Sequence, residues 1–571
     1  MICKPQSFVF RFRRLVAVAI TSLLCSFLLC VSIATAQHAD VPRPESWNDL
    51  VPGARFMDRF EPIPLLQPRV SAGWGVDDVR QRDVQNGIED DSFSYWGGNI
   101  LQDDDGRFHL FVCRWDEDHP KGHMAWRESI VVRATSDHRL GPYRVAEIIG
   151  QGHNPEAYRT ADGRVVCYVI DRKFECQSYV GRSITGPWEK VTPVYDTRDR
   201  KIIANLSNNS FSRREDGSFL MVNRGGGMWV SRDGLAPWEQ ITQGSNYPKV
   251  EGRFEDPVLW RSNVQYHMIV NDWYGRIAYH LRSKNGVHWK VDPGEAYMPG
   301  IAVSQDGQSD DWYKYERIKI FQDEHGRGIQ ANFAVIDFSK HDDLPNDQHS
   351  SKNISIPLKP GRLLTLSNPT AITDETAEVR LRIDAEVGFD PIRDLDLESL
   401  RFGAPEEVDF GRGATLIGTE PDDRGLVLIF AGKDCNFEDH HFAGKLIGRT
   451  RDDQMTFGYC RLPWVTYIEP VVTAKRPETM ANDAGQWVLR IPVANHGQVD
   501  AATSKISVQF DQTDPIILGC PPLKPYQSAN VVAAIPDDLL DGKPHQMTIG
   551  CGIGITQTNV FVADKVRLPA K

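Results

Sequence analysis

The sequence has little positive charge. Its 571 residues include 65 Lys and Arg against 77 Asp and Glu, and four of the cations lie within residues 1–36, where there is no acid. The remaining chain has 61 positive against 77 negative charges. A surface with this excess repels phosphate backbones, which excludes nucleic acid as an expected partner. An apolar content of 41% is ordinary for a globular protein and excludes disorder as the main state.

Cysteine is scarce as well. Seven of the ten cysteines follow residue 36, and their spacing matches no zinc pattern: Cys113, Cys167, Cys176, Cys435, Cys460, Cys520 and Cys551. An oxidising compartment permits the pairs Cys167–Cys176, Cys435–Cys460 or Cys520–Cys551, and buried free thiols are the alternative. The acid- and histidine-rich segment 435–441 could hold a metal, but a solvated loop is the favoured interpretation.

Long apolar runs are absent after residue 36, so no later segment is expected to span a membrane. The one long run, residues 15–33, lies between a basic stretch and small residues: Arg11, Arg13, Arg14 and then Ala34-Thr35-Ala36. This order is typical of a secretory signal peptide cleaved after Ala36. We expect residues 1–36 to be removed on export to the periplasm or the extracellular space. An uncleaved N-terminal membrane anchor is the alternative.

Convincing helical periodicity is absent from residues 90–345, where two markers recur instead. The first is a turn between short β-type runs: Asp105-Gly106, Asp162-Gly163 and Asp216-Gly217, with weaker versions at Ser262-Asn263 and His325-Gly326. The second is a turn ending in an aromatic residue: Gly141-Pro142-Tyr143, Gly186-Pro187-Trp188, Ala236-Pro237-Trp238 and Val287-His288-Trp289. Its aromatic residues are separated by 45, 50 and 51 positions. Asp-Gly between alternating apolar runs is a strong hairpin signal.

A period near 50 residues with about four strands per repeat is typical of β-propeller blades. We therefore predict an all-β fold with a five-bladed β-propeller over residues 37–362. A β-sandwich with coincidental turns is the alternative. The markers vanish after residue 363, and the alternating strands there predict one or two β-sandwich modules, over residues 363–466 and 467–571.

Residues at the same distance before each hairpin turn are expected to meet at one mouth of the propeller channel, because the inner strand of every blade lines it. Counting back six to nine residues finds five groups: Gly97-Gly98-Asn99, His153-Asn154-Pro155-Glu156, Asn208-Asn209-Ser210, Glu255-Asp256-Pro257 and Tyr315-Glu316-Arg317. Acids, amides and a histidine at such places suit the binding of hydroxyl groups better than they suit packing.

Asp256 and Glu316 are the candidate catalytic pair within these groups. Glycoside hydrolysis needs one carboxylic acid that protonates the leaving oxygen and one carboxylate that activates water or attacks carbon. Clustered acids and a cation such as Arg317 can separate their pKa values. The structural alternative is a turn at residues 255–257 and an ion pair between Glu316 and Arg317.

Hydroxyl-binding and ring-stacking residues complete the predicted site. The candidate substrate-binding residues are Trp96, Asn99, His153, Asn154, Asn209, Glu255, Tyr315 and Arg317. Trp115, Trp126 and Trp273 could also stack on sugar faces, although each ring is individually more typical of a blade core. His153 could equally satisfy the backbone of a neighbouring blade.

Taken in order, these motifs resemble the five-bladed propeller glycosidases, of the glycoside hydrolase family 43-like group and family 117. The motifs are the stretch 94–100 with its hairpin partner 105–111, then 152–156, 186–189, 255–260 and 315–317. The resemblance covers about residues 85–345. Family 117 removes 3,6-anhydro-L-galactose from agar oligosaccharides with inversion.

By position, the resemblance implies that Asp256 sets orientation and pKa and that Glu316 is the late-blade glutamate. The first-blade aspartate that serves as base would be Asp90 or Asp91, of which we prefer Asp91. Two positions depart from the pattern. Tyr315 stands where family 117 can place a histidine acid, and Gly97 stands where many propeller glycosidases carry an aspartate. No cofactor is required, and a divalent cation, Ca or Zn, in the channel is implied by the resemblance alone.

The predicted function is an exported, inverting and exo-acting glycoside hydrolase that trims algal or plant oligosaccharides. Asp91 would activate water, Glu316 would protonate the leaving oxygen and Asp256 would tune it. Three alternatives stay open: a sugar-binding propeller without catalysis, which Gly97 favours, a polysaccharide lyase, and a structural surface protein. The fold class does not decide among anhydrogalactose, galactose, arabinose, xylose and fucose as the sugar, and the oligomeric state is open.

Overall fold

The computed structural model describes residues 42–67, 85–196, 202–235, 237–272, 276–310, 312–345, 351–553 and 559–569. The expected signal peptide, Ala236 of the second marker and Trp273 lie outside these ranges. Within them the chain is built almost entirely from antiparallel β-strands. No helix in the described ranges is long and apolar enough to cross a membrane.

Five consecutive sheets account for the strands in the described residues between Phe93 and Pro357. The first contains β1 (Phe93–Gln102), β2 (Phe108–Asp116), β3 (Ile130–Ser136) and β4 (Arg144–Gln151). The second contains β5 (His153–Arg159), β6 (Val165–Ile170), β7 (Cys176–Gly181) and β8 (Trp188–Val191). The third contains β10 (Ser210–Arg213), β11 (Phe219–Val222), β12 (Met228–Ser231) and β13 (Trp238–Gln240), with β9 (Tyr195–Asp196) at its edge. The fourth contains β14 (Phe254–Arg261), β15 (Tyr266–Asp272), β16 (Ile277–Ser283) and β17 (Lys290–Val291), and the fifth β18 (Lys314–Gln322), β19 (Gly328–Ile336) and β20 (Ser351–Pro357).

The two sequence markers fall at equivalent places in these sheets. Each hairpin marker lies between the first two strands of a sheet, as Asp105-Gly106 lies between β1 and β2. The aromatic residue of the second marker opens or directly precedes the fourth strand in the first four sheets. The predicted hairpins are therefore confirmed, and the markers repeat because each sheet repeats the same pair of connections.

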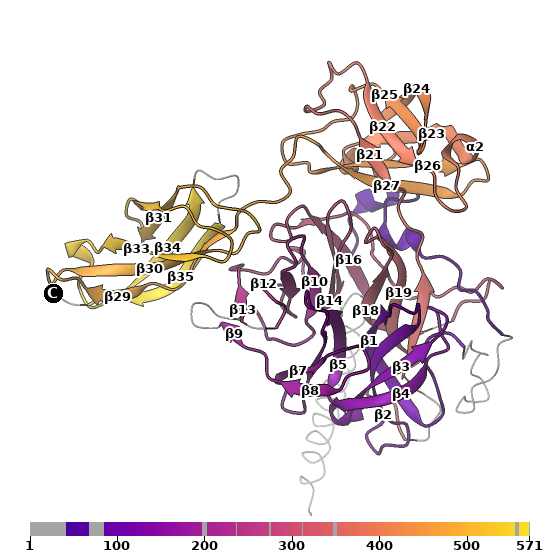
Figure 1. The fold of residues 1–571 in the computed structure, drawn as a ribbon, viewed down its shortest axis with the longest axis horizontal. Coiled ribbons are helices and arrows are strands. Elements are labelled where there is room, and N and C mark those ends of the chain that lie inside the picture. Colours follow the sequence, from indigo (N-terminus) through magenta and orange to yellow (C-terminus); the bar gives the residue numbers. More distant parts are fainter. Residues whose placement is uncertain are drawn as a thin grey trace, which may run out of the picture.

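The first strands of the five sheets form a ring (Figure 1). β1 contacts β5, β5 contacts β10, β10 contacts β14, β14 contacts β18, and β18 returns to contact β1. Apolar side chains pack between neighbouring sheets, for example Trp96 and Phe111 of the first with Ala157 and Val169 of the second. This propeller-like arrangement brings the starts of five strands to one end of the ring.

A bulge or a left-handed residue marks each of these strand starts. Register shifts fall at Trp96/Asn99, His153/Glu156, Glu255/Val258 and Glu316/Lys319. The residue inside or beside each irregularity has positive φ: Gly97 (64°), Asn154 (51°), Asn208 (53°), Asp256 (56°) and Arg317 (54°). β-Bulges often re-aim side chains next to functional sites. The repetition of one unusual backbone conformation at five equivalent places therefore indicates a shared purpose.

Two further units follow the ring (Figure 1). A seven-stranded sheet contains β21 (Leu364–Leu366), β22 (Val379–Asp384), β23 (Leu395–Gly403), β24 (Ala414–Asp422), β25 (Gly425–Phe430), β26 (Ala443–Thr450) and β27 (Met455–Arg461). Two four-stranded sheets then share one apolar core. The first holds β28 (Val472–Ala474), β29 (Glu478–Ala481), β30 (Trp487–Asn495) and β33 (Ser528–Ala534); the second holds β31 (Ser504–Phe510), β32 (Ile516–Cys520), β34 (Pro544–Ile553) and β35 (Asn559–Arg567).

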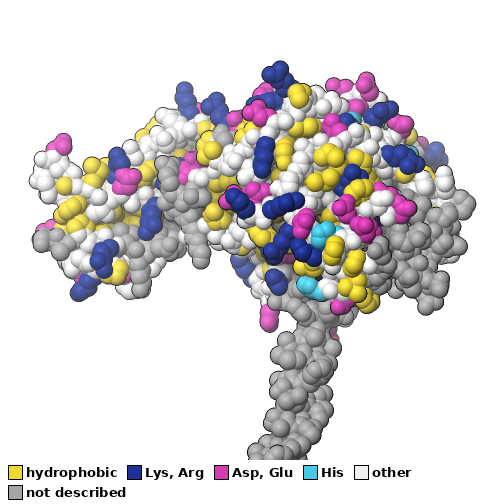
Figure 2. Space-filling view, turned by 90° about the horizontal axis from the view of Figure 1, so that it is seen from below, with side chains coloured by type: hydrophobic (Ala, Val, Ile, Leu, Met, Phe, Trp, Pro, Cys, Tyr) yellow, Lys and Arg dark blue, Asp and Glu magenta, His cyan; other side chains and the backbone are white. Residues whose placement is uncertain are grey.

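Short helices occupy the connections between the sheets. They are η1 (Glu45–Asp49), η2 (Phe56–Arg59), η3 (Gly122–Glu128), α2 (Pro391–Asp394), α3 (Pro405–Val408) and η4 (Asp537–Leu539). The last unit is joined to the ring by ion pairs, in which Lys475 lies 2.6 Å from both Asp196 and Glu239. On the face shown in Figure 2, acidic and basic side chains lie side by side, with a group of basic ones next to histidine.

The permitted disulfides do not form. Cys113, Cys167, Cys176, Cys435, Cys460 and Cys520 are free thiols, so each of the three suggested pairs lacks at least one member. Burial raises the pKa of the Cys113 and Cys435 thiols to about 12. Because the thiolate is the reactive form of cysteine, these buried side chains act as small apolar residues.

Candidate functional site

A pocket of about 390 Å³ lies at the end of the ring where the five strands begin. A cavity of this size is at the lower end of the range for small-molecule sites. Its lining combines aromatic rings with charged and amide groups: Trp96, His123, Met124, Trp126, His153, Asn154, Ile170, Phe174, Ser207, Asn208, Arg224, Arg253, Glu255, Asp256, Glu316, Arg317, Lys340 and His341.

A directed chain of hydrogen bonds crosses the floor of this pocket. Arg317 donates from Nη1 to Oδ1 of Asp256 over 2.7 Å. Asn208 donates to the same oxygen over 2.7 Å, and Asn154 donates to Oδ1 of Asn208 over 2.9 Å. These are the left-handed residues of the second to fifth sheets. The repeated backbone conformation therefore places four polar side chains in contact, and we call them the polar ring.

Glu316 is held as an anion. One carboxylate oxygen lies 2.6 Å from Lys314, and the other accepts a hydrogen bond from Lys340. Burial alone would raise the pKa of Glu316, but these two cations outweigh burial and lower it well below the usual range. The ammonium group of Lys340 also lies 4.2 Å from the ring centroid of Trp96, which fixes the lysine over the pocket wall.

The pKa of Glu255 is shifted in the opposite direction from that of Glu316. Burial raises the pKa of this carboxyl, and the negative charges of Asp256 and Glu316 raise it further, while Arg224 acts against them. Glu255 forms an ion pair with Arg224, whose side chain is partly exposed. The pocket thus contains one carboxyl biased toward the protonated form and one biased toward the ionised form, which is how environments assign acid and base roles.

Two histidines of the pocket, His153 and His123, are kept neutral by burial. Burial lowers the pKa of His153 and of His123 well below the usual range. Nδ1 of His153 lies 3.1 Å from the hydroxyl of Ser129, and the His153 ring packs 4.7 Å from that of Trp126. Nδ1 of His123 lies 2.8 Å from the hydroxyl of Ser351. Both histidines are therefore suited to hydrogen bonding rather than to carrying charge.

Most of the predicted site residues meet in this pocket. Its lining includes Trp96, His153, Asn154, Glu255, Asp256, Glu316 and Arg317, all of which the sequence analysis selected. Trp126 lines the pocket as well, whereas Trp115 is 4% exposed in an apolar cluster.

Other predicted residues lie elsewhere. Asp91 is exposed, outside the pocket lining, and accepts a hydrogen bond from the hydroxyl of Ser92. Asp90 accepts hydrogen bonds from Tyr95 and from backbone amides at the start of β1. Neither carboxylate lines the pocket, because both precede the strand whose bulged residue, Gly97, lies beside the polar ring.

Three predicted ligands of hydroxyl groups are placed elsewhere. Asn99 bridges two strands, since its side chain donates to the carbonyl of Ala157 and accepts from the amide of the same residue. Asn209 is fully buried, and Tyr315 packs its ring against Phe333. None of the three lines the pocket.

Sequence reasoning missed several residues of the pocket. Asn208 stood within the selected window, but its neighbour Asn209 was chosen. Lys340 follows the end of β19, and His123 lies on η3, so neither repeats at the spacing of the markers. Arg224 and Arg253 lie in loops as well. Only Asn208 carried a signal, namely its place in the repeat.

The side chains of the pocket do not fit a divalent cation in the channel. The carboxylate of the polar ring, Asp256, contacts the guanidinium of Arg317, which would repel a metal ion at that place. Deeper in the channel, Glu156 is paired with Lys319. The described residues contain no group of three or more His, Cys, Asp or Glu side chains that could hold a metal, including the described segment 435–441.

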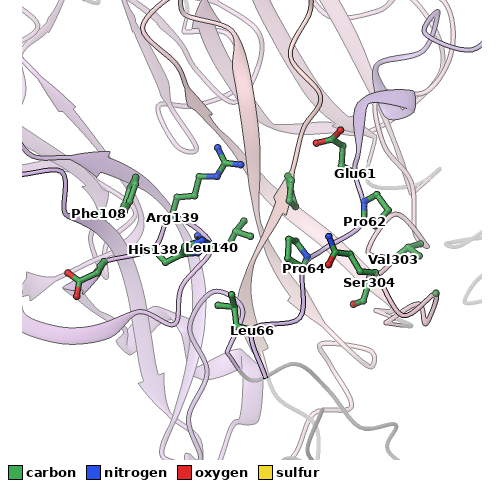
Figure 3. Close-up of a pocket in the computed structure, with 14 residues that line it drawn as sticks. Glu61, Pro62, Pro64, Leu66, Phe108, His138, Arg139, Leu140, Val303 and Ser304 are labelled. Carbon is green, nitrogen blue, oxygen red and sulfur yellow. Dashed lines mark hydrogen bonds between the residues drawn. The ribbon is translucent and has the colours of Figure 1, made fainter. Parts of the chain in front are cut away.

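A larger cavity, of about 830 Å³, lies beside the N-terminal segment (Figure 3). Figure 3 shows Glu61 on the side opposite His138, so these two titratable side chains do not converge. Its lining includes the prolines Pro62 and Pro64 and the aliphatic residue Leu66. The smaller pocket therefore remains the candidate site.

No protein-family model and no curated protein sequence matches the chain. Similar solved structures include a family 117 glycoside hydrolase from the marine bacterium Zobellia galactanivorans (10% identity, TM-score 0.36, 48% of this chain and 88% of that one). A xylan beta-1,4-xylosidase from Bacillus halodurans aligns over 86% of this chain and 92% of its own, at 12% identity and TM-score 0.33. An alpha-L-arabinofuranosidase from Lactobacillus brevis aligns over 47% and 94%, at 10% identity and TM-score 0.32. These are the groups of glycosidases that the sequence motifs resemble, and at such scores the function has to be argued from the side chains of this chain.

Proposed function

We propose that this protein is a glycoside hydrolase whose active site is the pocket around Glu255, Asp256 and Glu316. One observation carries the proposal: two carboxyl groups share one small pocket, and their surroundings bias their pKa values in opposite directions. Glycoside hydrolysis requires such a pair, one protonated and one ionised.

In the proposed mechanism, Glu255 protonates the glycosidic oxygen as its bond to the anomeric carbon breaks. The carboxylate of Glu316 stabilises the positive charge that develops on the sugar, and it accepts a proton from the water that forms the new bond to carbon. Asp256 and Arg317 form part of the pocket floor, and the hydrogen bond between them fixes the orientation of both side chains. These roles differ from the sequence-based assignment, since Glu255 replaces Glu316 as the acid and Asp91 has no part.

The finer features of the proposal have separate support. The ring of first strands supports a five-bladed β-propeller, and the shared core of the last two sheets supports a β-sandwich module. A pocket of about 390 Å³ supports exo action, because it has room for little more than the end of a chain. Inversion rests on the sequence resemblance, and the anomer first released, observed by ¹H NMR, tests it.

Export remains a proposal from residues 1–36. Cleavage after Ala36 would give a mature chain that begins at Gln37. Expression in a host with a secretion pathway, followed by N-terminal sequencing of the product, tests this. A mature protein that still carries residues 1–36 would contradict it and favour the membrane anchor.

A screen of the purified chain on defined algal and plant oligosaccharides tests the enzymatic proposal. The expected result is a released monosaccharide from at least one of them. A product that absorbs in the ultraviolet through an unsaturated uronate would instead identify a lyase. Absence of any product from the full panel would contradict hydrolysis.

Two observations favour a second candidate, a sugar-binding protein without catalysis. Both oxygens of Glu316 contact lysines, and the first sheet has Gly97 rather than an acid at the place of its left-handed residue. Under this alternative the chain binds an oligosaccharide of the panel, as measured by calorimetry, and releases nothing from it.

A further inference from the structure

One place in the polar ring has no side chain. Gly97 of β1 occupies the position that Asn154, Asn208, Asp256 and Arg317 hold in the other four sheets, and its φ of 64° is close to theirs. A Cβ atom at Gly97 would lie 3.7 Å from Oδ1 of Asn154 and 3.8 Å from Nε of Arg317. A Cβ atom there would be in ordinary van der Waals contact, so the missing side chain leaves a gap about the size of one heavy atom beside Asn154 and Arg317, which both line the pocket.

The two residues that flank this gap have unused hydrogen-bonding groups. Among the described residues, Oδ1 of Asn154 and both Nε and Nη2 of Arg317 have no hydrogen-bond partner. The side chain of Arg317 is 2% exposed, and Asn154 is 7% exposed. Buried polar groups without partners are costly, and such a group in a native protein calls for an explanation. A ligand in the gap supplies one.

The chemistry of that ligand follows from the hydrogen-bond directions. Oδ1 of Asp256 accepts from Arg317 and from Asn208, so Asn208 turns its NH₂ group toward Asp256 and its oxygen toward Asn154. Asn154 must then donate to Asn208, which leaves its own oxygen as an acceptor facing the gap. Arg317 offers only donors. A group placed between them has to accept from Arg317 and donate to Asn154, as a hydroxyl does, whereas a carboxylate or sulfate would be repelled by Oδ1.

We propose that the gap above Gly97 binds a hydroxyl group of the sugar substrate, which accepts from Arg317 and donates to Asn154. The proposal rests on the proposed function and defines its substrate class as a neutral sugar with a hydroxyl at that place. Gly97 is then a specificity-determining residue, because any side chain there occupies the space of the hydroxyl. The same chemistry is offered by water, and the experiment separates the two.

Substitution of Gly97 tests the proposal. Gly97→Ala fills the gap with one methyl group, and the side chains of Asn154 and Asp256 at φ of 51° and 56° show that this backbone conformation accepts a Cβ. Gly163→Ala is the matched control, because it has φ of 88° and nothing within 4 Å of its Cβ position. Calorimetric affinities of the full chain are measured for arabinose, xylose, galactose, fucose and 3,6-anhydrogalactose, for their monodeoxy derivatives, and for galacturonate.

We expect Gly97→Ala to lower the affinity for the best-binding neutral sugar at least tenfold, whereas Gly163→Ala should leave this affinity unchanged. One monodeoxy derivative should bind the native chain more weakly than its parent sugar by a similar factor. The same derivative should bind the native and Gly97→Ala chains with equal affinity. Unchanged affinity in Gly97→Ala, which means that water alone fills the gap, overturns the proposal, as does preferential binding of galacturonate. If the native chain hydrolyses an oligosaccharide and one of these two binding results is obtained, this inference is overturned but the proposed function is not. A native chain that neither binds nor hydrolyses any sugar overturns both.

Discussion

The two levels of the channel use polar residues for different purposes. At the pocket end, hydrogen-bonding atoms of Asn154 and Arg317 have no partner within the described residues. The pKa of Glu255, at the same end, is raised by burial and by neighbouring negative charges. A few residues deeper, the carboxylate of Glu156 is completely engaged by neighbouring groups. Glu156 accepts from the hydroxyl of Ser210 over 2.8 Å, from the amide of Phe211 over 3.0 Å and from Lys319.

This contrast separates structural from functional polarity within the same strands. A satisfied buried network stabilises and specifies a fold, while a partly satisfied one is justified where a ligand completes it. Both levels consist of the residue types that the repeat analysis selected. What distinguishes them is hydrogen-bond completeness, which residue type alone does not reveal.

The largest effect is expected from Glu255→Gln at the pocket end. The amide cannot donate a proton to the leaving oxygen, so kcat should fall by about 10²–10⁴-fold, the usual contribution of a general acid. Arg224 loses its partner but is partly exposed, so stability should change little. Steady-state kinetics on the active oligosaccharide measure the first effect and thermal unfolding the second. Activity within threefold of the native value would remove Glu255 from the mechanism.

The deeper level should respond in the opposite way. Lys319→Met leaves the carboxylate of Glu156 buried beside a methionine, although its two neutral donors remain. Loss of one partner of a buried ion pair costs about 3–5 kcal/mol of unfolding free energy. Chemical denaturation measures this loss, and kcat at a temperature where the variant is folded should stay near native. A stable variant without activity would reverse the comparison between the two levels.

The sequence predicted the repeating scaffold better than the site. Asp-Gly turns and aromatic positions depend on local backbone conformation, so their period located the hairpins. The same period predicted that Asp256 and Glu316 lie at equivalent places, and both line one pocket. Asn208 lines the pocket and its predicted neighbour Asn209 does not, and the left-handed conformation at Asn208 just before β10 carries no signal in the sequence. Two lysines keep Glu316 ionised: Lys314 opens β18, and Lys340 lies beyond the end of β19, where no period marks it.

A third test concerns the low-pH limit of activity. Lys340 and Lys314 keep Glu316 ionised, so activity should persist to pH values well below the usual pKa of a glutamate and should decline as pH rises through the raised pKa of Glu255. Lys340→Gln removes one cation, which raises the pKa of Glu316 and moves the low-pH limb of kcat/KM to higher pH. Lys249→Gln makes the same charge change on the exposed surface and should leave the limb in place. A limb that moves equally in both variants would mean that net charge, rather than the contact with Glu316, controls it.

The smallest effect is expected from Asp91→Asn, which also tests the pocket boundary most directly. Asp91 is exposed and outside the pocket lining, and its hydrogen bond to Ser92 can also be formed by an amide oxygen. Both kcat and KM should therefore equal the native values within error, and Glu255→Gln measured beside it shows that the assay detects a loss. If Asp91→Asn abolished turnover instead, the first-blade base implied by the resemblance would be correct, and the start of β1 would have to move toward the pocket when substrate binds. Hydrogen-bond completeness would then not distinguish the two levels of the channel, because a residue already engaged at the surface would carry the chemistry.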